Sequence, residues 1–372
     1  MLKYINGKAD ATNRYKNLYW EGYFTEEPAL VLDKILANNI SEIRGQYSLL
    51  YIDDQVTPGV SLNLGYPLYT NGIDYSNDPL DFGATLDESK VNNLLRKHNE
   101  QLAVLDLEDY CVFTKCKLIL PTEKITAKEY TTNDIVKQFL NTIRIATQNC
   151  SVGIMFGDGW DSHCLLSACQ KIGIDPTLVY VKSKQQTRVK ELGKYVILKP
   201  NPCIEVTDYS LHHNLNFTIQ HRYMIQEPLE FDVILRGNDA EIYSMNSMLY
   251  QKSGNIKKVI PNNTTRNSIF ELNTNNKWVD PFINTNITSS ILAGNLSLKD
   301  KSLQKNICTN HSLVISNSIS DIIEAKTYST IIMQNLKYLQ SIPNLSNHIK
   351  EAATIESGLW LNTIRNIMDR YI

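Results

Sequence analysis

The sequence predicts two successive parts: an α+β part made of β-rich layers, and an α/β part built on a doubly wound parallel sheet with a helical C-terminus. Residues 1–130 hold short aromatic and β-branched runs separated by turn signals, a pattern typical of strands. In residues 131–372, apolar runs of strand length alternate with helical patterns, which favours a parallel sheet covered by helices. We therefore expect two domains that meet near residue 130.

The first part offers few residues with obvious chemistry. Residues 29–37 repeat apolar side chains at helical spacing, and residues 43–54 form an aromatic, β-branched run that ends in an acidic turn. Residues 62–69 indicate another strand, which Pro67 limits to a sheet edge or a strand end. Acidic, basic and nucleophilic side chains do not cluster in this stretch of sequence, so we expect its role to be structural.

The second part opens with a helix. Residues 131–134 are a cluster of helix-capping residue types, and an amphipathic pattern follows them. Short apolar runs at 176–181 and 233–235 predict two further strands, and Gly173 is expected to end the helix before the first of them. Helical spacing returns beyond residue 312 and predicts the helical C-terminus.

The strongest local signal lies at residues 151–169. An apolar run stops at Gly157, a turn rich in glycine and aspartate follows, and a helical pattern begins near Ser162. A strand, a glycine-rich turn and a helix N-terminus together direct backbone N–H groups at a phosphate. Many α/β proteins carry such a turn and bind nothing there, so this stretch alone leaves nucleotide binding undecided.

A second turn of the same kind strengthens the case. The strand expected at 233–235 runs into Gly237, Asp239 and Glu241. The carboxyl ends of parallel strands share one edge of a sheet, so this turn and the one after Phe156 should lie on the same edge. Backbone donors there could hold a triphosphate, and the acids could hold Mg²⁺. A single turn acid is more often solvated, but two such turns at one edge favour a function.

Composition excludes several classes of protein. The chain has 372 residues and a formal net charge of −2, which argues against nucleic acid as a partner without excluding it. Neither an apolar stretch of about 18 residues nor a secretory signal is visible, so we expect no membrane span and no export. The seven cysteines are scattered and form no C-x-x-C pair. We therefore expect a cytoplasmic protein with reduced thiols and no structural zinc site.

Two runs of the first part resemble the N-terminal glutaminase domain of the asparagine synthetase family. The G-Q-Y-S-L run from Gly45 is similar to the family's G-x-F-A-F strand, and the G-Y-P-L-Y run from Gly65 is similar to its G-x-x-P-L-Y strand. The resemblance implies an Ntn-hydrolase-like fold. The family's nucleophile is a cysteine at position 2, where this chain has Leu2, so the resemblance implies the fold without glutaminase activity. The β-lactam synthetases and lasso-peptide cyclases show the same loss.

Four segments of the second part resemble, in the same order, the ATP-pyrophosphatase-type synthetase domain of that family. Residues 157–162 are similar to the S-G-G-x-D-S pyrophosphate loop, and residues 237–241 are similar to the S-G-D-G-A-D-E loop. Residues 279–284 are similar to the P-F-L-D segment, and residues 300–305 are similar to the E-K-x-x-L-R segment. In the first loop, Asp158 stands where the family has glycine, which adds a negative charge beside the expected phosphates.

The resemblance implies an ATP-dependent ligase that joins a small-molecule or peptide carboxylate to an amine through an acyl-adenylate, with AMP and pyrophosphate as products. ATP and Mg²⁺ are the implied cofactors. The implied nucleotide-binding residues are Gly157, Asp158, Gly159, Asp161, Ser162 and Gly237. The implied metal ligands are Asp161 and Asp239, and the implied catalytic residues are Lys301, which matches the family's catalytic lysine, and Glu241. Glu241 is also an alternative metal ligand.

Two other functions stay open at this point. The altered loop is compatible with a catalytically impaired relative that binds a nucleotide, or nothing, and serves as a scaffold. The basic residues within 182–194 are compatible with an adenylating enzyme that modifies a nucleic-acid base, although such a run is more often a solvated helix face. The acidic overall balance weakens this last interpretation.

Overall fold

The computed structural model describes most of the N-terminal half of the chain and selected stretches of the rest. The described residues are 1–61, 66–85, 87–90, 93, 105–106, 108, 111–123, 126–157, 159–181, 191–198, 230–237, 258–259, 277–282, 284–296, 301–308 and short stretches between 329 and 365. Three of the predicted site residues, Asp158, Asp239 and Glu241, lie outside these residues.

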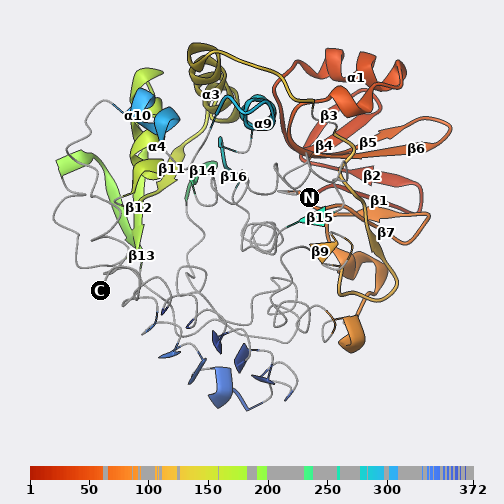
Figure 1. The fold of residues 1–372 in the computed structure, drawn as a ribbon. Coiled ribbons are helices and arrows are strands. Elements are labelled where there is room, and N and C mark those ends of the chain that lie inside the picture. Colours follow the sequence, from red (N-terminus) through yellow and green to blue (C-terminus); the bar gives the residue numbers. More distant parts are fainter. Residues whose placement is uncertain are drawn as a thin grey trace.

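The N-terminal part holds two antiparallel sheets (red to orange in Figure 1). The first sheet has the order β3-β4-β5-β6, with β3 at Asn13–Tyr15, β4 at Leu18–Phe24, β5 at Gly45–Ile52 and β6 at Val56–Val60. The second has the order β10-β7-β8-β1-β2, with β1 at Lys3–Ile5, β2 at Lys8–Asp10, β7 at Tyr69–Thr70, β8 at Tyr75–Ser76 and β10 at Lys117–Leu118. Short β9 (Leu105–Asp106) and β15 (Lys258–Val259) pair with each other.

Strand β5 is buried on both of its faces, so its polar residues Gln46 and Ser48 are buried together with its apolar ones. Tyr47 and Leu49 pack in one cluster with Val31 of helix α1 (Pro28–Leu36). Leu50 packs in another cluster with Tyr69 of the second sheet. Because successive side chains of a strand point to opposite faces, β5 lies in a middle layer, between α1 and the second sheet.

The structure confirms the predicted helix at 29–37 and the predicted strand at 43–54, and of the strand expected at 62–69 it corrects residues 66–68, since residues 62–65 lie outside the described residues. Among the described residues of that last segment, only Tyr69 lies in a strand. Pro67 has no backbone N–H to donate to a neighbouring strand. Its carbonyl accepts a hydrogen bond of 2.5 Å from the side-chain amide of Asn77 instead, so the chain there is anchored by a side chain.

The second part contains a five-stranded sheet in which every neighbouring pair is parallel. Its order is β13-β12-β11-β14-β16, with β11 at Val152–Met155, β12 at Thr177–Val181, β13 at Tyr195–Leu198, β14 at Val233–Leu235 and β16 at Lys277–Val279. Strands β12 and β13 lie on one side of β11, and β14 and β16 lie on the other side. The strand order therefore reverses between β11 and β14, which is the position where open parallel sheets bind their ligands.

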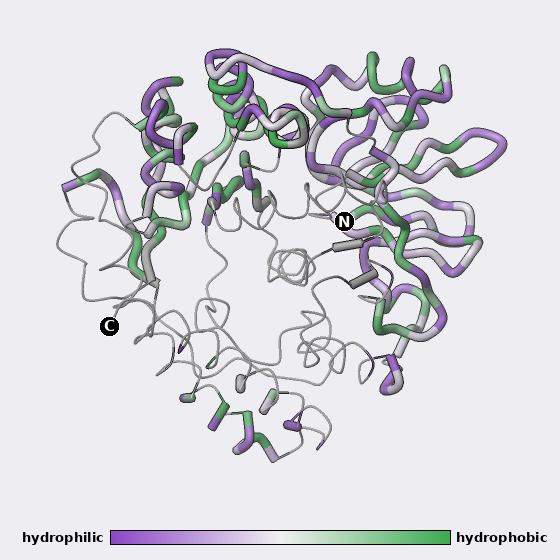
Figure 2. Tube along the Cα trace, in the orientation of Figure 1, coloured by the Kyte–Doolittle hydropathy of each residue, from purple (hydrophilic) through white to green (hydrophobic). Residues whose placement is uncertain are grey.

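Helices accompany this sheet. They are α3 (Thr132–Ala146), α4 (Trp160–Lys171), α9 (Thr285–Leu292) and α10 (Ser302–Ile307). Hydrophobic and hydrophilic residues alternate every few positions along α3 (Figure 2), and its buried positions include Ile135, Phe139 and Ile143. Helices α3, α4 and α10 contact one another, and they share one hydrophobic cluster with the central strands. This packing fixes α10 against the start of α4.

The two parts contact each other directly. Tyr23 of β4 belongs to the hydrophobic cluster of the parallel sheet, and the Gln46 side-chain amide donates a buried hydrogen bond of 2.7 Å to the carbonyl of Asp280. Leu339 and Ala353, from the C-terminal stretch, pack in the cluster that contains Leu2. Among the described residues, no helix combines the length and apolar character that crossing a membrane requires.

Candidate functional site

Two adjacent strands bring the predicted loops to one edge of the sheet. Strands β11 and β14 pair in parallel. At their amino ends, the backbone N–H and the hydroxyl of Ser151 both donate to Asp232 Oδ2, each at 2.7 Å, so the register of the pair is held there. The carboxyl ends therefore emerge together, and Gly157 and Gly237 follow them on the same edge.

The first loop joins β11 to α4. Helix α4 begins at Trp160, two residues before the predicted start, and Gly159 is its N-cap in an extended conformation. A glycine cap supplies no side chain, so it leaves the N–H groups of the first helical turn to other acceptors. The Ser162 hydroxyl donates within the loop, where the carbonyls of Gly157 and Gly159 are its acceptors. The hydroxyl therefore shapes the turn, and its expected phosphate contact stays a prediction.

Space is open beside the two loop glycines. A Cβ atom built on Gly159 would meet no heavy atom of the described residues within 4 Å. In the described part of the chain, the one heavy atom within 4 Å of a Cβ built on Gly157 would be Ser162 Oγ, at 4.0 Å. The backbone at the N-terminus of α4 is therefore approachable, as the close contact of a phosphate requires.

The Asp161 carboxylate, in the first turn of α4, is contacted by Gln304 of α10 and by Lys301, the N-cap residue just before α10. Gln304 Nε2 donates to Asp161 Oδ1 at 2.7 Å, and Lys301 Nζ lies 3.5 Å from the same oxygen. The Asp161 side chain is 26% exposed and that of Lys301 is 11% exposed, so this ion pair is partly shielded from solvent. Asp161 and Lys301, which were predicted from motifs far apart in the sequence, are thus in contact.

Gly237 completes this arrangement from the second loop. A Cβ atom at Gly237 would lie 2.8 Å from Asp161 Cβ and 3.1 Å from Cε2 of Phe282. Real Cβ atoms do not approach so closely, so the contact needs a glycine. The structure therefore brings Gly157, Gly159, Asp161, Ser162, Gly237 and Lys301 together, and the remaining predicted residues lie outside the described part of the chain.

Gln304 is the site residue that sequence reasoning missed. It lies three residues after Lys301, the N-cap of α10, and both side chains reach the same Asp161 oxygen. The similar segment of the asparagine synthetase family has leucine at this position. The polar residue in place of an apolar one was therefore the sequence feature that could have pointed to Gln304. Its neighbour Leu303 is fully buried in the core cluster, which holds this short helix in place.

A buried polar cluster lies behind Gly237. Arg236, the preceding residue, is buried together with Tyr66 and Glu21 of the N-terminal part. Burial raises the pKa of Tyr66, the charge of Glu21 raises it further, and the charge of Arg236 lowers it. Burial also raises the pKa of Tyr23, and Tyr66 and Asp280 add to this effect. The site therefore rests on polar contacts between both parts of the chain.

Position 2, where the resembling family has its glutaminase nucleophile, has a structural role in this chain. Leu2 is fully buried, and its backbone N–H donates to Asn77 Oδ1 at 2.8 Å. The N-terminal ammonium of Met1 forms an ion pair of 2.7 Å with Glu21. The leucine side chain carries no nucleophile, and it packs in the cluster between the two N-terminal sheets.

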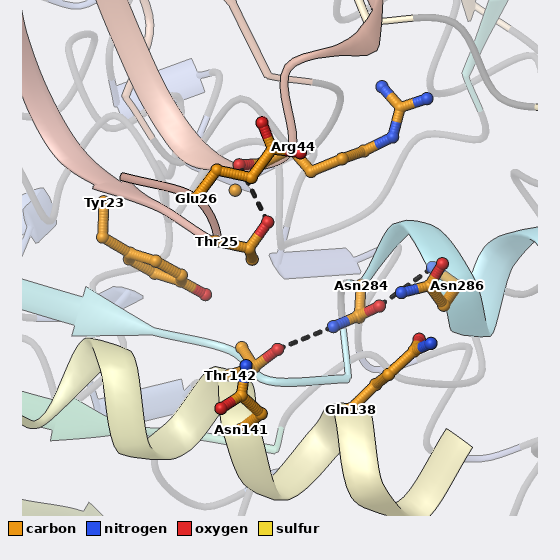
Figure 3. Close-up of a pocket in the computed structure, with 10 residues that line it drawn as sticks. Tyr23, Thr25, Glu26, Arg44, Gln138, Asn141, Thr142, Asn284 and Asn286 are labelled. Atoms are coloured by element: carbon orange, nitrogen blue, oxygen red, sulfur yellow. Dashed lines mark hydrogen bonds between the residues drawn. The ribbon is translucent and has the colours of Figure 1, made fainter. Parts of the chain in front are cut away.

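A separate cavity of about 300 Å³ lies between the N-terminal part and helices α3 and α9. Figure 3 shows Thr25 and Arg44 on one side, and Gln138 and Thr142 of α3 on the other. The Asn284 amide donates to the Thr142 hydroxyl at 2.8 Å. The described residues that line this cavity include none of the predicted site residues.

Comparisons add no relative to this picture. The chain matches no protein-family model and has no significant match among curated proteins. The relation to asparagine synthetases is therefore a resemblance carried by short motifs. Within the described stretches, no group of three or more His, Cys, Asp and Glu side chains is placed to hold a metal ion.

Proposed function

We propose that the protein is an ATP-dependent amide-forming ligase. One observation carries the proposal: Asp161, Gly237 and Lys301 come from three separate motifs and meet at the edge where the strand order reverses. If the three motifs resembled the family only by chance, we would not expect their residues to lie together in the fold. An open parallel sheet binds its ligands at this same edge.

The residues present fit a polyphosphate. The N-cap of helix α4 is Gly159, which brings no capping side chain, and the described residues leave space beside it. Lys301 supplies a cation within reach of the same helix turn. Backbone donors and a lysine are the groups that cradle phosphates in other glycine-rich loops. In this proposal, Lys301 also offsets the negative charge that builds up on oxygen during adenylyl transfer.

Asp161 fits the role of a Mg²⁺ ligand. Mg²⁺ is commonly held by one or two carboxylates together with phosphate oxygens and water, so a cage of several protein ligands is not required. Asp161 is the candidate carboxylate among the described residues, with Asp239 or Glu241 proposed as the second. The substrate carboxylate would attack the α-phosphate of ATP and release pyrophosphate, which gives an acyl-adenylate, and an amine would then attack the acyl carbon and displace AMP.

The amine is proposed to arrive without glutamine hydrolysis in this chain. Leu2 is buried where the resembling domain uses a cysteine, and it carries no nucleophile. A small-molecule or peptide amine is therefore the proposed acceptor. We expect the protein to release no glutamate from glutamine in the presence of ATP and Mg²⁺.

ATP–pyrophosphate exchange tests the proposal. The purified chain is incubated with labelled pyrophosphate, ATP, Mg²⁺ and pools of amino acids and other carboxylates. We expect exchange that depends on one pool, and a loss of at least about 100-fold in Asp161→Ala, since charge stabilisation of this kind is worth that much. Asp134→Asn is the control, because Asp134 is exposed and lies in the first turn of another helix, α3.

Other outcomes point to the alternatives. If calorimetry shows no nucleotide binding at millimolar ATP and Mg²⁺, the ligase proposal fails and a scaffold role replaces it. A steep salt dependence of DNA or RNA binding would favour an adenylating enzyme that acts on nucleic acid.

A further inference from the structure

Helix α10 and its N-cap residue present two different donors to one carboxylate oxygen. Asp161 Oδ1 accepts from Gln304 Nε2 at 2.7 Å and lies 3.5 Å from Lys301 Nζ. The shorter contact comes from the neutral side chain, and the longer one comes from the charged side chain. The geometry therefore makes the amide the closer anchor of the carboxylate.

Gln304 has the properties of a fixed anchor. Its side chain is completely buried, and its Oε1 atom has no hydrogen-bond partner among the described residues. Turning the amide over would place Oε1 against the carboxylate, where two acceptors repel each other. The adjacent Leu303 and Ile307 are also fully buried in the core cluster, so the helix that carries Gln304 is held in place.

Lys301 has the properties of an exchangeable counter-ion. Its ammonium is a point charge on a flexible four-carbon chain, and it lies at the edge where the space beside Gly159 is open. In the ligand-free protein, Lys301 and Asp161 offset each other's charge. An anion at the start of α4 competes with Asp161 for Lys301, and a divalent cation competes with Lys301 for Asp161.

We propose that Lys301 exchanges between Asp161 and an anionic ligand, and that Gln304 is the positioning residue that holds the carboxylate in both states. The proposal rests on the site of the proposed function and deepens it, but it requires only ion binding. It predicts that the two α10 side chains affect cation binding in opposite directions. A residue that merely packs the helix would not produce this difference in sign.

The experiment measures Mn²⁺ binding to the full chain without nucleotide, by electron paramagnetic resonance of the free ion. Lys301→Met removes the competing ammonium, so we expect affinity to rise about tenfold. Gln304→Met keeps the volume but removes the donor, so we expect affinity to fall about tenfold, as when other residues that orient metal ligands are removed. The same fall is expected when Gln304→Met is added to Lys301→Met.

Controls separate positioning from general damage. Asn306→Met changes an exposed amide on the same helix, and it should leave Mn²⁺ affinity unchanged. Asp161→Asn should abolish the binding. An anion arm uses inorganic triphosphate with chelator present, and Lys301→Met should weaken this binding about tenfold, whereas Asn306→Met should not. If Gln304→Met does not fold, Lys301→Met still tests the exchange, since it replaces a side chain at the edge of the site.

The outcomes distinguish this inference from the ligase proposal. Equal Mn²⁺ affinity in wild type, Lys301→Met and Gln304→Met overturns the inference and leaves the ligase proposal standing, because ATP and Mg²⁺ could enter as one complex. Absence of Mn²⁺ binding in Lys301→Met also overturns it. The expected opposite shifts, together with no ATP–pyrophosphate exchange, would support the inference and remove the ligase.

Discussion

Two glycines of the site are required for different structural reasons, although both follow strands of the same sheet. Gly237 makes room for Asp161 and Phe282, because its missing Cβ would lie within 3.1 Å of each. Gly159 has no such neighbour among the described residues, so a Cβ there would meet none of their atoms within 4 Å. In the proposed function, a phosphate lies there.

Alanine should therefore mainly reduce stability at Gly237 and mainly reduce ATP binding at Gly159. We expect Gly237→Ala to lower the free energy of unfolding by about 1–3 kcal/mol, the usual effect of overpacking. Gly159→Ala should lower it by less than about 1 kcal/mol, since alanine is only a poorer helix cap, but it should weaken ATP binding. Denaturant unfolding and calorimetry measure the two effects. Equal destabilisation, with ATP affinity unchanged at Gly159→Ala, would contradict this assignment.

Individual site residues were predictable where a motif marked them. Asp161 and Lys301 carry recognisable patterns, and the structure brings them together. Gln304 does not, because a glutamine within a helix has many possible roles and only the fold shows that it faces Asp161. The cluster around Arg236 was equally hidden, since its partner Tyr66 lies in the other part of the chain and the two meet only after folding.

Helix α10 connects stability to the site at the scale of one element. Its Leu303 is fully buried in the core cluster, and its Lys301 and Gln304 contact Asp161. We expect Leu303→Ala to lower the free energy of unfolding by about 2–5 kcal/mol, because it removes buried methyl groups and leaves a cavity. Loss of this packing should also release both contacts to Asp161.

Thermal or denaturant unfolding checks the stability change, and nucleotide binding below the melting temperature checks the effect on the site. Asn306→Ala, on the exposed face of the same helix, should change stability by no more than about 0.5 kcal/mol. A Leu303→Ala protein that is destabilised but binds ATP like the wild type would show that α10 does not position the site.

Elements with strong local signals were predicted well. Thr131 caps α3 by accepting from the Asp134 N–H at 3.1 Å, and Gly173 follows α4 with φ of +78°, as their residue types indicate. The prediction did not include β13 and β16. Their parallel pairing with β12 and β14, which only the fold shows, defines them as strands.

The whole molecule depends on contacts that no local pattern reveals. The shared edge of β11 and β14 was predictable, because parallel strands share their carboxyl ends. The hydrogen bond from Gln46 to the Asp280 carbonyl joins residues 234 positions apart. Tyr23 likewise lies on a strand of the N-terminal sheet and packs in the core of the second part. Such contacts follow from how the layers dock.

This docking should make the protein sensitive to alkali. Burial raises the pKa of both Tyr23 and Tyr66 in the folded protein, whereas phenols of the unfolded chain ionise near pH 10. Above about pH 10, the unfolded state therefore binds fewer protons than the folded state, so stability falls as pH rises. Each buried phenol should contribute about 1.4 kcal/mol per pH unit to this fall.

Denaturant unfolding between pH 8 and pH 11 tests the argument. Tyr23→Phe removes one ionisable group from the contact between the two parts, so the fall in stability above pH 10 should become shallower by about 1.4 kcal/mol per pH unit. Tyr195→Phe, on β13 with an exposed side chain, is the matched control and should keep the wild-type slope. An unchanged slope in Tyr23→Phe would mean that this phenol reaches solvent in the folded protein, and that the two parts separate before the chain unfolds.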